Sequence, residues 1–110
     1  MRKITISRKN SFIASLMVAH VILDDQDEPV ASLKSGQVVT LMVDDEEHTI
    51  ALAWVEGYFS HKRVVKSRSL KIKPGNQPVN FGIDMIHFMF AQSQFVLYVI
   101  GDTLSKKLIK

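Results

Sequence analysis

The chain of 110 residues contains no cysteine, three prolines and a single tryptophan. Without cysteine, disulfides, thiolate nucleophiles and cysteine-based zinc sites are excluded. No Gly-x-Ser-x-Gly elbow for a serine nucleophile is present. The histidines lie too far apart in sequence to form a local metal pair: His20, His48, His61 and His87. We therefore predict a protein that is not an enzyme and that carries no cofactor.

Length and hydrophobic content predict one domain, residues 1–110, because 46% hydrophobic residues can form one core of ordinary size. Two apolar runs have some features of a signal peptide or a transmembrane segment. The run 12–23 follows basic residues but contains His20 and lacks a small-x-small cleavage site, so we predict no signal peptide and a cytoplasmic protein. The run 81–100 is interrupted by Asp84 and other polar residues, which favours buried strands over a transmembrane segment.

The stretch from Val21 to Trp54 consists of four apolar runs separated by two acidic turns and a Lys-Ser-Gly turn. Further short apolar runs follow, with turns about every ten residues. This pattern predicts an all-β fold, a single antiparallel β-sandwich of immunoglobulin-like type with seven or eight short strands. Segment 84–92 fits either a helix or a strand, and we favour a strand because its Phe and Ile residues prefer sheets.

Alternation within these runs predicts which side chains face the core. Near the N-terminus, Ile4 and Ile6 face inward, and the Arg8 to Ser11 segment is a polar break. Later strands show the same alternation. Val39, Leu41 and Val43 share one face of a strand, opposite Thr40 and Met42, and the next strand has one face formed by His48, Ile50, Leu52 and Trp54.

Turn residues in the first half of the chain resemble a pattern in small uncharacterised bacterial β-domains. The matching segments are Val21-Ile22-Leu23-Asp24, Ser32-Leu33-Lys34-Ser35-Gly36 and His48-Thr49-Ile50, and the N-terminal segment from Ile4 to Phe12 also resembles the start of such proteins. PEGA-type surface domains have a similar layout. The resemblance implies a non-catalytic β-sandwich without a family active site.

Acidic and basic residues are separated along the chain. The acidic turns 24–28 and 44–47 could bind calcium through their carboxylates if they met at one end of the sandwich, but we favour solvated turns. In turn 44–47, nothing in the local sequence neutralises the four acids, so we expect it to be exposed. A basic strip comprises Lys62, Arg63, Lys66, Arg68, Lys71 and Lys73. We favour a solvated edge strand there over a nucleic-acid or anionic-polymer site.

Trp54, Tyr58, Phe59 and His61 form the candidate ligand site, because loop aromatics can stack on sugars. The alternative for Trp54 is a core position, since it shares a face with Ile50. The segment from Ile83 to Ile100 is more apolar than a small sandwich needs, which favours a self-association or partner surface. We predict an interaction module that self-associates or binds a protein partner, with a glycan or small-ligand module as the alternative.

Overall fold

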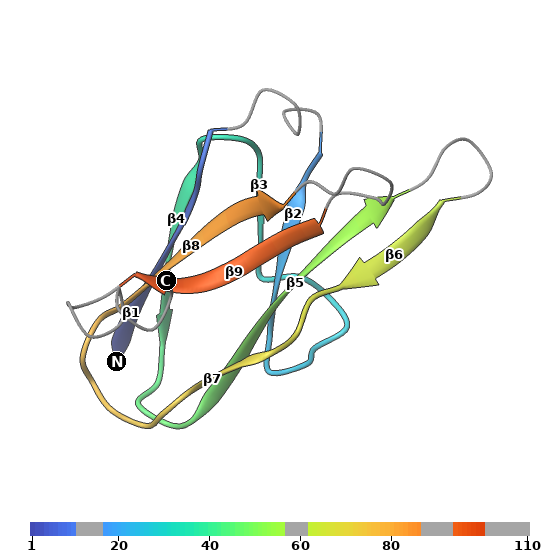
Figure 1. Cartoon of the computed structure of the whole chain (residues 1–110). Coiled ribbons are helices and arrows are strands. Elements are labelled where there is room, and N and C mark those ends of the chain that lie inside the picture. The colour runs from blue at the N-terminus through green and yellow to red at the C-terminus, as the bar shows by residue number, and fades with distance from the viewer. Residues whose placement is uncertain (11–16, 57–61, 87–93, 101–110) are drawn as a thin grey trace.

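The computed structural model describes residues 1–10, 17–56, 62–86 and 94–100, and within them the chain is all-β, with nine strands in two sheets and no helix (Figure 1). The first sheet, sheet A, has the order β4 (Val38–Val43), β1 (Arg2–Arg8), β8 (Val79–Ile86) and β9 (Gln94–Ile100). The second, sheet B, has the order β3 (Ala31–Leu33), β2 (Ala19–Leu23), β5 (His48–Glu56) and β6 (Arg63–Lys66), with β7 (Leu70–Ile72) also paired to β5.

One strand pair corrects the predicted antiparallel arrangement. β1 and β8 run parallel, with Ile4 opposite Val79, whereas the other described pairs are antiparallel. Hairpin patterns in a sequence report only on neighbouring strands, which pair antiparallel through short turns. β1 and β8 are separated by most of the chain, so no turn signal could indicate their relative direction.

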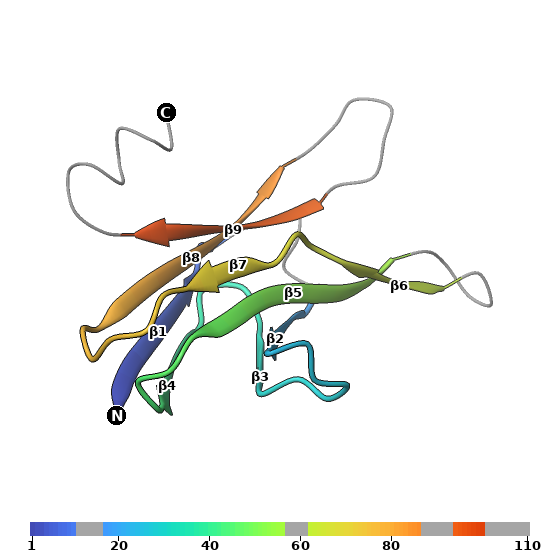
Figure 2. The ribbon, with the colours of Figure 1, turned by 90° about the horizontal axis from the view of Figure 1, so that it is seen from below.

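Side chains from both sheets form one hydrophobic core, and Figure 2 shows the sheets as two layers. Sheet A contributes Ile4 and Phe81, and sheet B contributes Leu52 and Trp54, each at most 2% exposed. The predicted alternation is confirmed in β1, β4 and β5, where the faces that carry Ile4, Val39 and Ile50 are the more buried ones. On β5 the opposite face is buried as well at Ala51.

Two buried arginines lie at the ends of the inward face of β1, where the sequence indicated a polar break after Ser7. Arg8 belongs to the strand and is 4% exposed, and its guanidinium donates to the carbonyl oxygens of Met17 and Leu33, each at 2.6 Å. Burial lowers the pKa of Arg8. At the other end, the Arg2 guanidinium donates to main-chain oxygens of the β7–β8 connection. Both side chains therefore satisfy main-chain carbonyl groups that lie outside sheet A.

The partner strand of β5 is interrupted between β6 and β7. Ser67 lies in the interruption, where its backbone N–H donates to the Leu52 carbonyl oxygen and its Oγ accepts from the Leu52 N–H, both at 2.8 Å. The hydroxyl thus replaces a main-chain acceptor, so β5 keeps its hydrogen bonds while the chain turns outward at Arg68.

Several predicted boundaries change or lie outside the described residues. β2 begins at Ala19, inside the apolar run 12–23, and residues 12–16 of that run lie outside the described residues. Of the ambiguous segment 84–92, residues 84–86 are strand and the remainder lies outside the described residues. In the described part of the chain, no helix has the length and apolar character to cross a membrane.

Candidate functional site

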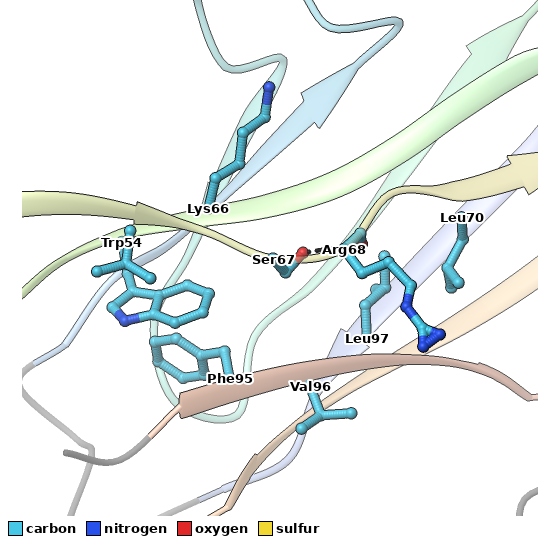
Figure 3. Close-up of a pocket in the computed structure, with 9 residues that line it drawn as sticks. Trp54, Lys66, Ser67, Arg68, Leu70, Phe95, Val96 and Leu97 are labelled. Carbon is cyan, nitrogen blue, oxygen red and sulfur yellow. Dashed lines mark hydrogen bonds between the residues drawn. The ribbon is translucent and has the colours of Figure 1, made fainter. Parts of the chain in front are cut away.

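A groove of about 520 Å³ lies between the outer edges of the two sheets, where β6 and β7 face β9 (Figure 3). It forms because β6 and β7 are the last strands on one side of sheet B and β9 is the last strand on the same side of sheet A. The volume is within the usual range of small-ligand pockets, roughly 300–1,000 Å³. Its apolar lining comes from Trp54, Val65, Leu70, Phe95, Val96 and Leu97.

Two aromatic rings lie together at one end of the groove (Figure 3). Trp54 on β5 and Phe95 on β9 meet edge to face, with ring centroids 5.4 Å apart and an interplanar angle of 82°. This geometry is a favourable one for aromatic pairs and joins sheet B to sheet A. The indole Nε1 of Trp54 is buried and has no hydrogen-bond partner among the described residues.

The polar rim of the groove is formed by consecutive residues at the β6–β7 interruption: Lys66, Ser67 and Arg68. The Lys66 ammonium lies 3.5 Å from an Asp25 carboxylate oxygen, and in Figure 3 its side chain points away from the groove. The Arg68 side chain extends toward β9, and no partner for its guanidinium is found within the described residues. None of the described residues lining the groove is acidic, so the rim is cationic.

Of the four predicted ligand-site residues, the structure places only Trp54. Tyr58, Phe59 and His61 lie outside the described residues. Trp54 is 2% exposed and belongs to the core, as the alternative prediction stated. A ring this buried offers no open face to a sugar, although Trp54 is one of the residues that line the groove.

His48 connects the two acidic turns and forms a polar cluster that the sequence did not predict. Its Nδ1 lies 2.7 Å from an oxygen of Asp24, and its Nε2 lies 2.7 Å from an oxygen of Asp44. The pKa of His48 is raised, mainly by the hydrogen bond to Asp24. Burial acts in the opposite direction, and the hydrogen bond to Asp44 raises the pKa further. With both nitrogens protonated, the imidazolium donates to both carboxylates.

Asp24 is held in place by the first two residues of β5, His48 and Thr49. Its backbone has φ 53°, in the left-handed region, where Asp is one of the few tolerated residues. Its other carboxylate oxygen accepts from the Thr49 N–H at 2.9 Å, and its own N–H donates to the Thr49 carbonyl. On the facing turn, the Glu46 N–H and then His48 lower the pKa of Asp44 by hydrogen bonding.

These contacts correct part of the prediction for the acidic turns. Turn 44–47 is exposed, as predicted, but its acids do have partners: His48 for Asp44, the Met1 amino group for Asp45 and Lys71 for Glu47. Among the described residues, no group of three or more histidines and acids has the arrangement needed to hold a metal ion. The two turns do meet, but they meet around an imidazole that takes the position a cation would need.

The basic strip is divided by its ion pairs rather than forming one patch. Lys66 pairs with Asp25 across the sheet edge, and Lys71 pairs with Glu47 at 3.9 Å. Its members from Lys62 to Lys73 are exposed, which fits the solvated edge that we favoured. Arg68 differs from these lysines because its side chain borders the groove.

The outer edges of the two sheets differ in charge. In sheet B, β6 and β7 contain Arg63, Lys66 and Lys71, and β3 is only three residues long. In sheet A, neither β4 nor β9 contains a charged residue. Charged and short edge strands resist pairing with other chains, so the edges of sheet A are the ones open to it.

In comparisons with models of protein families, with curated proteins and with solved structures, nothing matches this chain. The resemblance of the turn segments to PEGA-type domains stays a prediction. The candidate sites are therefore defined by their geometry: the groove beside β9, the His48 cluster and the uncharged edges of sheet A.

Proposed function

We propose that this protein is a non-catalytic β-sandwich of immunoglobulin-like type that acts as an interaction module, and that it self-associates through the edge of β4. The observation that carries the proposal is the uncharged outer edge of this strand. β4 pairs only with β1 among the described strands, and its outward side chains Val38 and Met42 are 61% and 54% exposed. Natural edge strands usually carry charge, proline or a bulge against such pairing.

The hydrogen bonds of β4 define how a second copy would pair. The Arg8 N–H donates to the Gln37 carbonyl oxygen at 2.9 Å. Hydrogen-bonded pairs alternate along an antiparallel ladder, so Val39, Leu41 and Val43 bond to β1. The main-chain groups that point to the outer edge are those of Val38, Thr40 and Met42.

These three residues form a self-complementary set. In an antiparallel pair of two β4 strands centred on Thr40, Val38 lies opposite Met42 of the second copy and Thr40 lies opposite Thr40. All three pairs then exchange main-chain hydrogen bonds, and the exposed apolar side chains pack on one another. The result is a two-fold symmetric dimer in which sheet A continues across both copies.

The test compares Thr40→Pro with Thr40→Val by light scattering over a concentration series. Both variants lose the threonine hydroxyl, but only proline removes the N–H that points to the outer edge. We expect wild type and Thr40→Val to dimerise and Thr40→Pro to dimerise at least about tenfold more weakly, because the dimer loses two hydrogen bonds of about 1 kcal/mol each.

Two results would count against the proposal. A wild-type protein that stays monomeric at the highest concentration would exclude self-association. A dimer that persists unchanged in Thr40→Pro would place the interface on another surface. Circular dichroism on each variant checks that the fold is retained, because proline is tolerated at the outward-bonded positions of an edge strand.

A further inference from the structure

The groove beside β9 lies on the opposite side of the sheets from β4, and its chemistry is different. We infer that this groove binds a small amphipathic carboxylate, with its apolar body along the groove and its carboxylate at Arg68. This site is independent of the β4 edge, so either assignment can hold without the other.

The apolar body is indicated by the lining of the groove. Val65 and Leu70 come from the strands of sheet B, and Phe95 and Leu97 come from β9, so apolar side chains face the groove from both sheets. Figure 3 shows the Trp54 and Phe95 rings together at one end and Arg68 nearer the other. A ligand that fills the space between them must therefore be apolar along its length and polar at one end.

The negative charge of the ligand is indicated by the rim. Arg68 is exposed and borders the groove, and its guanidinium has no carboxylate partner among the described residues. Lys66 is already paired with Asp25, and the Ser67 hydroxyl is committed to main-chain groups at 2.8 and 3.2 Å. Arginine presents a planar set of donors that matches the two oxygens of a carboxylate. A neutral head group has neither the negative charge nor the paired oxygens for this two-point contact.

Trp54 supplies a direct readout of binding, because it is the single tryptophan of the chain and lines the groove. We would titrate the protein with octanoate and octylamine below their micelle concentrations, and with octanol below its solubility limit, and follow tryptophan emission. Octanoate should give a saturable change, octanol should bind about tenfold more weakly and octylamine more weakly still.

The matched variants are Arg68→Gln and Lys73→Gln. Each removes one positive charge, but only Arg68 lines the groove. Arg68→Gln should remove the preference for octanoate over octanol, and Lys73→Gln should retain it. Equal binding of octanoate and octanol by wild type, an unchanged preference in Arg68→Gln, or no saturable change with octanoate would each overturn the assignment. An extended peptide of alternating leucine and glutamate that binds more tightly than octanoate would also overturn it, in favour of a chain segment as occupant.

Discussion

Arg8 lies over the ring of Phe95, with its guanidinium carbon 4.6 Å from the ring centroid. This contact places a cation from the end of β1, an inner strand of sheet A, against the aromatic pair that lines the groove. The same guanidinium donates to the carbonyls of Met17 and Leu33, so three separate parts of the chain meet on one side chain. Its burial is compatible with the fold because the polar group has acceptors and an aromatic face.

Replacing Arg8 with methionine should therefore destabilise the protein by about 2–4 kcal/mol, because the buried carbonyl of Leu33 and the part-buried carbonyl of Met17 lose their donor and the contact with Phe95 is lost. Lys3→Met is the matched control, since Lys3 is on the same strand and points outward. Urea denaturation of both variants measures the difference. Equal midpoints for the two would show that Arg8 does not hold these segments.

Stability should depend on pH through His48. Its pKa is raised above the ordinary value of 6.5, so its protonated form is favoured in the folded state. The stabilisation is fully present below about pH 6.5 and is lost as the pH rises through the raised pKa of the folded protein. The pKa of Asp44 is lowered in the folded protein. The stabilisation that Asp44 contributes is therefore present above the ordinary pKa of an aspartate and is lost as the pH falls through the lowered pKa.

Denaturation midpoints between mildly acidic and mildly alkaline pH test this expectation. His48→Gln should flatten the decline on the alkaline side. His20→Gln is the matched control, because the Nδ1 of His20 lies 2.7 Å from the hydroxyl of Ser32 rather than from a carboxylate. An alkaline decline that persists in His48→Gln would contradict the assignment.

The double variant Asp45→Asn, Glu46→Gly should keep the fold and change stability by no more than about 1 kcal/mol, with relieved repulsion between acids favouring the variant. Both residues are exposed at the turn, and the partner of the Asp45 carboxylate is the exposed amino group of Met1 at 3.4 Å. Asp44→Asn should instead lower stability, because His48 loses a charged partner.

Thermal denaturation with and without millimolar calcium is the measurement for this turn. We expect no calcium effect on the parent or on the double variant, since His48 lies between the acidic turns. A calcium-dependent increase seen only in the parent would show that Asp45 and Glu46 bind the ion.

Gly82 and Tyr98 should be energetically coupled. They are opposite one another in the β8–β9 pair, and a Cβ added at Gly82 would lie 2.6 Å from the Tyr98 hydroxyl oxygen. Gly82→Ala must therefore displace the ring, and we expect a loss of about 1–2 kcal/mol. In a Tyr98→Ala background the same change should cost less than half as much. A double-mutant cycle measures the coupling, and additive effects would contradict it.

Alternation of apolar and polar residues was sufficient to predict the all-β fold and the buried faces of β1, β4 and β5. The period-2 pattern reflects burial on one side of a strand, which is a local property. It failed at Arg8, because a buried arginine depends on carbonyls that lie elsewhere in the chain. It also could not indicate the parallel direction of β1 and β8, which depends on long-range pairing.

The candidate sites were less predictable than the fold. Trp54 was singled out for its residue type, but its role at the groove depends on Phe95, which belongs to a strand of the other sheet. The His48 cluster combines two acidic turns whose contact depends on the register of β2 and β5. A sequence signal did exist for the uncharged edge: Val38 to Val43 contains no charge, although its position at the border of sheet A became known only from the sheet order.

The parallel pairing of β1 with β8 has a consequence for the order in which the chain folds. The strands of sheet B pair with one another within residues 19–72 and can form early, whereas β1 gains β8 as its second neighbour only when residues 79–86 are in place. Closing such a long loop costs entropy before any contact compensates for it. The completion of sheet A should therefore be a late and slow step. Until then, the edge of β1 that pairs with β8 stays unpaired.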